Sequence, residues 1–416
     1  MIRQAEAGHA RAGEGAASGS PTRLLIISHV IHYRYAGRLH AYAAYAREID
    51  LWADLFPQVL IASPLRDERP PGDCAPFERS NVSIDPQPET GGTTASAKAW
   101  QVLRVPYLVY RLLRSVAGAD AIHVRCPGNL GLLGALVAPL SGVPVVAKYA
   151  GNWIGYPGEP WSLRFQRAVL RSRWWRGPVT VYGEWPGQPE HVVPFFTSVM
   201  TGAQVARARG VAARRRLGAC LRLLYVGRLA PNKNVDVLVE ALAELRGRGL
   251  PVECAIVGDG PARANLELLV AERGMAEWVR FVGAIPFDEV QRWYEWGDVL
   301  VLASDAEGWP KAIAEAMAYG LVCIGADRGF IPRMLSDGRG ILVQPGDRVG
   351  LVDAIVAVMA RPDQHLDMGA RAAVWAHRYS LEGLRAAIGE LLSERWRVDV
   401  RYRPDPAPPV LADEPG

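Results

Sequence analysis

Short apolar runs alternate with longer helical segments along most of the chain, and this alternation limits the possible folds more than any other feature. In the first half the runs are continuous rather than interrupted by polar residues, which is typical of parallel strands buried on both faces. The gaps are long enough for crossover helices, and one of them spaces four apolar residues near helical periodicity: Leu103, Tyr107, Tyr110 and Leu113. The pattern predicts a doubly wound α/β domain. Its expected strands are 24–30, 59–63, 121–125, 143–148 and 179–182.

A second α/β series follows an arginine-rich stretch at 201–217. Its expected strands are 223–226, 252–257, 279–282, 299–303, 322–325 and 341–343. The chain has 416 residues, a length that suits two domains better than one core. Two doubly wound domains joined by a linker predict a ligand site in a cleft beyond the carboxyl ends of the strands.

Composition excludes several classes of protein. The formal net charge of +4 is a mild excess, so nucleic acid is not an expected partner. The 5 cysteines are widely spaced and include no CxxC pair, which predicts neither a disulfide framework nor a zinc site. The first residues lack the apolar stretch of a signal peptide, and no run is long enough to span a bilayer. We therefore expect a cytoplasmic protein.

The most informative motif runs from Glu307 to Gly320, directly after an expected strand. Pro310 suits the first turn of a helix, and the start of that helix is a site for a phosphate group. Glu307 precedes the helix and Glu315 lies about two turns into it, so the two carboxylates can accept hydrogen bonds from separate hydroxyls of one extended ligand. The alternative reading is an acid that favours the helix dipole and a solvated glutamate.

Two further loops belong to the same sheet edge. In the stretch 225–234, Gly227 lets the backbone turn closely at the end of a strand, and Arg228 and Lys233 are suited to a diphosphate. In the stretch 257–263, Gly258 and Gly260 form another strand-to-helix turn, which matches a dinucleotide fingerprint only weakly. Each loop alone also fits an ordinary surface turn.

Together the three motifs resemble the donor domain of the family 4 glycosyltransferases, which have the two-domain GT-B fold. The resemblance covers residues 223–347, about a third of the chain. It implies a metal-independent enzyme that moves a sugar from a nucleotide diphosphate-sugar to a hydroxyl acceptor and retains the anomeric configuration. The acceptor is a polysaccharide, a glycolipid or a small natural product. No cofactor is expected besides the nucleotide diphosphate-sugar co-substrate.

The resemblance also implies roles for particular residues. Arg228 and Lys233 would bind the diphosphate and stabilise its charge as it leaves, Glu307 would contact the donor sugar, and Glu315 would hold the ribose hydroxyls. The remaining implied donor contacts are the backbone after Pro310 at Lys311 and Ala312, and the base-side residues Val282 and Ile285.

The implied domain organisation has six parts. Residues 1–21 are a disordered leader, 22–200 an N-terminal acceptor-binding domain and 201–220 an interdomain linker. Residues 221–378 are the nucleotide-sugar-binding domain, 379–399 a crossover helix that packs back on the N-terminal domain, and 400–416 a disordered tail.

The first half departs from the family pattern. Relatives carry a Gly-Gly pair after the first strand, where only Gly37 remains here, and a histidine after a later strand, where Lys148 and Asn152 are the polar candidates. His29 and His32 are alternatives on the opposing edge of the cleft, whereas His123 is expected to be structural.

Aromatic residues in the first half offer acceptor contacts. Trp153, Tyr156 and Trp161 can stack on a sugar ring, although an ordinary packed loop is an equal reading. The cations and tryptophans at 171–176 suit either weak peripheral membrane contact or a solvated helix end.

Two other functions use the same donor loops: a nucleotide-sugar epimerase or hydrolase, and an idle nucleotide-sugar-binding subunit. The first needs acid–base groups opposite the anomeric carbon, which the weak histidine pattern disfavours. The absent histidine leaves the second open.

Overall fold

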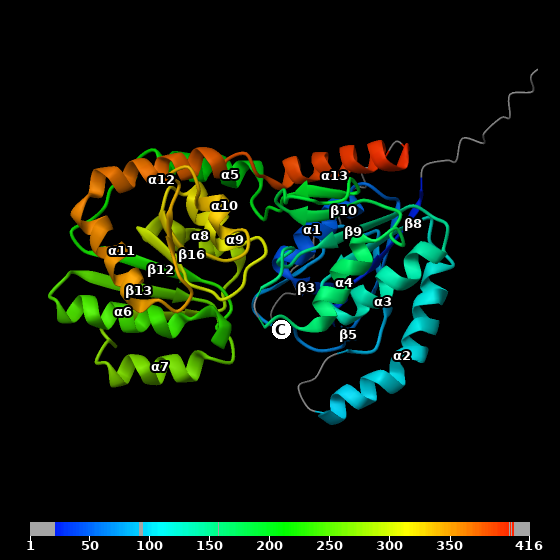
Figure 1. Ribbon diagram of the computed structural model, residues 1–416, viewed down its shortest axis with the longest axis horizontal. Helices are drawn as coiled ribbons and strands as arrows, with labels where there is room; N and C mark the ends of the chain where they lie inside the picture. The colour runs from blue at the N-terminus through cyan, green and yellow to red at the C-terminus, as the bar shows by residue number, and fades with distance from the viewer. Residues whose placement is uncertain (1–20, 91–94, 157, 399, 401, 403–416) are drawn as a thin grey trace, which may run out of the picture.

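The computed structural model describes residues 21–90, 95–156, 158–398, 400 and 402 (Figure 1). The predicted leader at 1–21 and the predicted tail at 400–416 lie almost entirely outside these residues. The chain forms two α/β bodies side by side, the first on the right of Figure 1 and the second on the left.

A parallel sheet forms the centre of the first body. Its spatial order is β11-β10-β9-β8-β1-β4-β7. Alternate residues of β1 enter different cores: Leu24 and Ile26 face one side of the sheet, and Leu25 and Ile27 face the other. Burial on both faces explains why the apolar run is continuous. The strands are β1 (Arg23–Ile27), β4 (Gln58–Ser63), β7 (Val82–Pro86), β8 (Ala121–Cys126), β9 (Val145–Tyr149), β10 (Val179–Tyr182) and β11 (Val192–Phe195).

The second body is built in the same way, with the order β14-β13-β12-β15-β16-β17. In both sheets the first strand of the series stands in the interior and the direction of winding reverses beside it. This is the doubly wound arrangement, so the predicted fold class is confirmed. The strands are β12 (Leu221–Val226), β13 (Val252–Val257), β14 (Val279–Gly283), β15 (Val299–Leu302), β16 (Val322–Ala326) and β17 (Ile341–Val343).

A small mixed sheet, for which the sequence predicted no strands, follows β1. β2 and β3 form an antiparallel hairpin, and the sheet order is β5-β2-β3-β6. Gly37 lies in the hairpin turn with a φ of 71°, a conformation that glycine adopts without strain. The strands are β2 (His32–Tyr35), β3 (Arg38–Tyr42), β5 (Leu65–Arg66) and β6 (Cys74–Pro76).

Helices cover both faces of the first sheet. α2, α3 and α4 share one apolar core with it, and α1 and α13 share the other. α13 belongs to the end of the chain but lies along the first body, as Figure 1 shows. The helices are α1 (Ala43–Ala53), α2 (Ala95–Val116), α3 (Asn129–Val137), the 3₁₀ turn η1 (Ala138–Leu140), α4 (Trp161–Arg171) and α13 (Leu381–Trp396).

The second sheet is also covered by helices. The stretch 201–220 contains α5, which begins with a capping box between Thr201 and Gln204. The helices are α5 (Gly202–Ala212), the 3₁₀ turn η2 (Pro231–Lys233), α6 (Val235–Gly247), α7 (Arg263–Glu272), α8 (Phe287–Trp296), α9 (Lys311–Ala318), α10 (Ile331–Leu335), α11 (Arg348–Ala360) and α12 (Pro362–Ala376).

Candidate active site

The strand order of the second body places its ligand site. The winding reverses between β12 and β15, and in open α/β sheets ligands bind beyond the carboxyl ends of strands at such a point. The loop after β12 carries Arg228 and Lys233, and the loop after β15 carries Glu307. Lys233 and Glu307, which are 74 positions apart in the sequence, therefore meet at one edge of the sheet.

An ion pair joins these two loops. Lys233 Nζ donates to Glu307 Oε1 at 2.5 Å, and both side chains are largely shielded from solvent. Asn234 strengthens the junction, since its amide donates to the Ala303 carbonyl and to Asp305 Oδ1, both at 2.8 Å. Asn234 has a φ of 52°, which turns the chain from η2 into α6. The loops thus form one braced unit.

Glycines allow the neighbouring loops to approach. A Cβ on Gly258 would lie 1.9 Å from the Gly227 carbonyl oxygen, and one on Gly260 would lie 2.3 Å from the Leu229 carbonyl oxygen. Tyr225 Oη donates a hydrogen bond to the Arg228 carbonyl at 3.0 Å and so stabilises the turn after β12. The side chain of Arg228 is exposed at this edge. The glycines predicted from the sequence are required here by close backbone approach.

Helix α9 begins at Lys311, immediately after Pro310. Its first amides, including those of Lys311 and Ala312, have no acceptor within the helix and present a partial positive charge. Gly329 lies against the preceding loop, where a Cβ would come within 1.9 Å of the Glu307 carbonyl oxygen. The helix start therefore stands beside the Lys233–Glu307 pair.

Glu315 is buried on α9, with 7 % of its surface exposed. Tyr294 Oη on α8 donates to its Oε2 at 2.7 Å. Burial raises the pKa of Glu315 to about 7, although Tyr294, Lys311 and Arg47 act in the opposite direction. A carboxyl group with a raised pKa inside an apolar surrounding is typical of a functional site. Tyr294 was not anticipated, because no motif marks it.

The base-side candidates lie at the end of β14. Val282 and Ile285 are half-buried and pack against the second core. The Gly258 amide donates a hydrogen bond to the Gly283 carbonyl at 2.9 Å, so the end of β14 is joined to the loop after β13.

The first body faces the site closely. A Cβ on Gly308 would lie 2.6 Å from the Ala150 carbonyl oxygen, so the Glu307 loop touches the end of β9. Lys311 Nζ lies 5.9 Å from the ring centre of Tyr42, which ends β3. Burial lowers the pKa of Lys311, and Glu48 and Arg125 of the first body act on it in opposite directions. Tyr42 lies near the site because it ends the β2–β3 hairpin, which was not predicted from the sequence.

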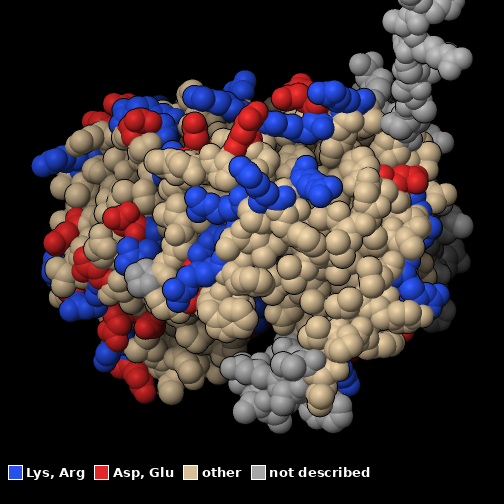
Figure 2. Space-filling view, turned by 45° about the vertical axis from the view of Figure 1, so that its right-hand side comes forward, with Lys and Arg blue, Asp and Glu red and all other residues tan. Residues whose placement is uncertain are grey.

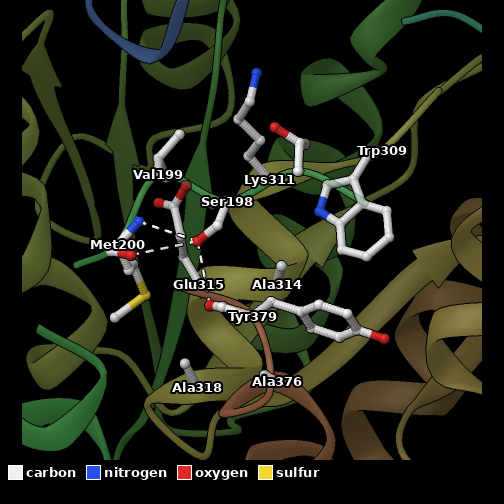
Figure 3. Close-up of a pocket in the computed structure, with 11 residues that line it drawn as sticks. Ser198, Val199, Met200, Trp309, Lys311, Ala314, Glu315, Ala318, Ala376 and Tyr379 are labelled. Atoms are coloured by element: carbon white, nitrogen blue, oxygen red, sulfur yellow. Dashed lines mark hydrogen bonds between the residues drawn. The ribbon is translucent and has the colours of Figure 1, made fainter. Parts of the chain in front are cut away.

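A pocket also opens between α9 and the segment 197–200, which connects the two bodies (Figure 3). Ser198 is fixed there by hydrogen bonds between its hydroxyl group and the backbone of Met200 and Tyr379. Lys311 and Glu315 line this pocket, so the buried face of α9 is shared between it and the candidate donor site. The lining residues are Thr197, Ser198, Val199, Met200, Trp309, Lys311, Ala314, Glu315, Ala318, Ala376 and Tyr379.

Two of the acceptor-side expectations are wrong because the side chains are committed to the core. His32 is fully buried; its Nδ1 lies 2.8 Å from Ser63 Oγ and its ring stacks on Phe77. Trp153 is 2 % exposed and packs edge-on against Tyr149. Both side chains are therefore packed inside the first body.

Three other first-body candidates also have local roles. Lys148 Nζ donates to Glu48 Oε2 at 2.8 Å, and Arg125 pairs with the other oxygen of Glu48 at 2.6 Å, so Lys148 belongs to a buried ion cluster. Asn152 shapes its own loop, with its amide donating to the Gly155 carbonyl. Gly37 occupies the hairpin turn in open space.

Among the histidine alternatives, His29 lies at the carboxyl end of β1. Its ring sits against Gly128, which precedes α3 next to β8, and burial and the charge of Arg125 lower its pKa. This is the point where the winding of the first sheet reverses. His123 is fully buried and stacks on Trp52, in keeping with the structural role expected for it.

Two facing doubly wound domains, with braced cationic loops and a helix start at the switch point, define the class of two-domain nucleotide-sugar transferases. Residues 220–361 match the family described as glycosyl transferases group 1. The chain is 31% identical over 310 residues to the alpha-D-kanosaminyltransferase of Streptomyces kanamyceticus, covering 68% of this chain and 78% of that protein. It is 32% identical over 315 residues to the GDP-mannose-dependent alpha-(1-6)-phosphatidylinositol monomannoside mannosyltransferase of Mycolicibacterium smegmatis, covering 71% and 82%.

Solved structures show the same architecture. Anabaena Alr3699/HepE in complex with UDP-glucose superposes with a TM-score of 0.64 at 18% identity, covering 90% of this chain and 100% of that chain. Sucrose-phosphate synthase from Thermosynechococcus elongatus also gives 0.64, at 19% identity, covering 90% and 98%. At this identity the likeness concerns the fold. The chain belongs to the group 1 glycosyltransferases of GT-B fold and is an enzyme that uses a nucleotide-sugar donor. The comparisons favour neither the epimerase or hydrolase nor the idle subunit.

Proposed function

We propose that this glycosyltransferase moves its sugar with retention of anomeric configuration and without a divalent metal ion. The observation that carries the proposal is the junction of the β12 and β15 loops, where Lys233 meets Glu307 beside the start of α9. Fixed cations and a helix terminus at one point can stabilise a diphosphate, which is the role that a metal ion plays in other enzymes.

The ion pair suggests how the donor is received. In the free enzyme the carboxylate of Glu307 neutralises Lys233. A bound diphosphate pairs with Lys233 and Arg228 in place of Glu307, and the freed carboxylate of Glu307 accepts hydrogen bonds from hydroxyls of the sugar. Glu315 then accepts from the ribose hydroxyls, and Val282 and Ile285 flank the base.

The reaction follows from where charge develops. As the bond between the anomeric carbon and the diphosphate oxygen breaks, negative charge grows on the leaving group. Arg228, Lys233 and the amides of Lys311 and Ala312 favour that state over the ground state. The acceptor hydroxyl attacks from the face that the diphosphate leaves, and its proton passes to a diphosphate oxygen. The new bond therefore has the configuration of the old one.

The first body supplies the acceptor side. His29 at the end of β1 and Tyr42 at the end of β3 are the side chains that support this role best. The relatives named above are a kanosaminyltransferase and a phosphatidylinositol monomannoside mannosyltransferase, so their names leave the acceptor class open.

Lys233→Ala tests the donor site. We expect kcat/KM for donor hydrolysis and for transfer to fall about 100-fold or more, because a fixed charge at the leaving group is lost. Arg248→Ala is the matched control, since Arg248 is an exposed cation at the end of α6 that pairs with Glu244. Wild-type rates in the Lys233 variant would remove the residue from the mechanism, and an inverted anomeric centre in the product by NMR would refute retention.

A further inference from the structure

One face of the first body carries apolar side chains that its fold does not use. In α2, Leu108, Leu112 and Val116 form the stripe that packs on the sheet. The residues whose spacing first indicated the helix lie on its opposite side. Leu103 is 72% exposed and Tyr110 is 56% exposed. From residue 103 onward, where the burial of this helix is described, the exposed large apolar side chains are Leu103, Val105, Tyr107, Tyr110 and Leu113. The helix therefore has a second apolar stripe that faces solvent.

The neighbouring helices extend this surface. α3 packs between α2 and α4, and Trp174, just after α4, donates its indole N–H to the Ala135 carbonyl of α3 at 3.2 Å. Trp161 at the start of α4 is 73% exposed and its ring lies 6.3 Å from that of Phe165. We name the exposed apolar side chains of these helices, and of the segments directly before or after them, the α2–α4 face: Leu103, Tyr107, Tyr110, Leu113, Leu140, Ile154, Trp161, Phe165 and Trp174.

Exposed apolar side chains elsewhere do not gather in this way. On the second body they are Leu268, Leu342, Val349 and Val374, which lie on four different elements, α7, β17, α11 and α12. Figure 2 shows the first body brought forward, with a broad expanse of uncharged surface and blue Lys and Arg side chains at its margins. A large exposed apolar surface with a polar margin marks an interaction site.

Basic residues outnumber acids in this part of the chain. The sequence from 91 to 183 contains only Asp120 and Glu159 as acids. Glu159 is buried against Arg167, and Asp120 accepts from Thr22 at the start of β1. The exposed cations around the α2–α4 face are Arg114, Arg164, Arg171, Arg173 and Arg176.

We propose that the α2–α4 face docks on a bilayer containing anionic phospholipids. Tryptophan and tyrosine suit the boundary between headgroups and acyl chains, and arginines attract the anionic headgroups. Symmetric pairing of two copies through this face would bring two sets of like charges together, which disfavours a dimer as the occupant. None of the described helices has both the length and the hydropathy to cross a bilayer.

The face also leads to the cleft. Ile154 lies in the loop after β9, and that loop begins at Ala150, which touches Gly308 of the donor-side loop. A docked enzyme would present its cleft beside the membrane surface, where the acceptor is a lipid-linked sugar or polyol. This choice of acceptor rests on the proposed function, whereas the docking does not.

Co-sedimentation with phospholipid vesicles tests the docking. We expect the protein to sediment with phosphatidylcholine vesicles that contain about one third phosphatidylglycerol, weakly with phosphatidylcholine alone, and less at high salt. Leu103→Gln combined with Tyr110→Gln should lower the partition coefficient about tenfold or more, as should Arg173→Gln combined with Arg176→Gln. Leu268→Gln, equally exposed on α7, should leave it unchanged.

Two outcomes would overturn the proposal: no binding of the wild-type chain to anionic vesicles, or equal binding by all variants. A dimer in solution that the Leu103 and Tyr110 changes dissociate would instead assign the face to a second copy. Slow hydrolysis of a nucleotide-sugar in the absence of acceptor should be equal in the wild type and all these variants. Its absence in a wild-type chain that binds vesicles would refute the proposed function and leave the docking intact.

Discussion

Replacing Glu315 with glutamine should make the protein more stable and a poorer enzyme. The carboxyl group is buried, and burial raises its pKa from 4.5 to about 7. The folded state thus holds a proton that the unfolded state releases between these values. Stability that depends on this proton is present below the unfolded pKa and is lost as pH rises toward the folded pKa.

The size of the effect follows from the two pKa values. One pKa unit corresponds to about 1.4 kcal/mol, so full ionisation of Glu315 costs the folded state about 3 kcal/mol above pH 7. Glutamine keeps an oxygen that can accept from Tyr294 Oη but carries no charge. The gain from Glu315→Gln should be under about 1 kcal/mol at pH 5 and about 3 kcal/mol at pH 8.5.

Urea unfolding of the wild type and the variant at both pH values measures this difference. Glu272→Gln, on the exposed end of α7, is the control and should change the free energy of unfolding by less than about 0.5 kcal/mol at either pH. An unchanged or lower stability of Glu315→Gln at pH 8.5 would refute the assignment of a costly buried carboxylate. The donor KM should rise in the variant, since a neutral amide is a weaker acceptor for ribose hydroxyls than a carboxylate.

Two further predictions concern the donor loops and the absence of a metal. Gly258→Ala should lower the free energy of unfolding by more than about 2 kcal/mol and reduce donor affinity, because the added Cβ would lie 1.9 Å from the Gly227 carbonyl oxygen. The control is Gly247→Ala at the end of α6. The space around its added Cβ is open, so this change should be neutral or slightly stabilising. Prior treatment with excess EDTA should leave the transfer rate unchanged, and a loss of activity that Mg²⁺ or Mn²⁺ restores would contradict the metal-independent mechanism.

The sequence by itself determined the fold class and the donor loops. Burial on both faces of parallel strands requires continuous apolar runs, and such runs are visible without a structure, as β15 and β16 illustrate. Gly258 directly follows a strand, Lys233 and Glu307 lie in loops that follow strands, and the carboxyl ends of parallel strands meet at one edge. Their proximity could therefore be predicted from chain order.

Only the tertiary structure decided which side chains of the first body face the cleft. His32, Lys148 and Trp153 are polar or aromatic residues near strand ends, and nothing local separates a buried partner from an exposed ligand group. The burial of His32 and Lys148 depends on Phe77 and Glu48, which are distant from them in the sequence.

In α2 the residues with apolar spacing are exposed rather than buried. Helical spacing of Leu103, Tyr107 and Tyr110 predicts an apolar face but does not say which neighbour covers it. The sheet is covered by the stripe of Leu108 and Leu112 instead. Periodicity is a property of one helix, whereas burial is a property of what packs against it, and only the assembled chain contains that information.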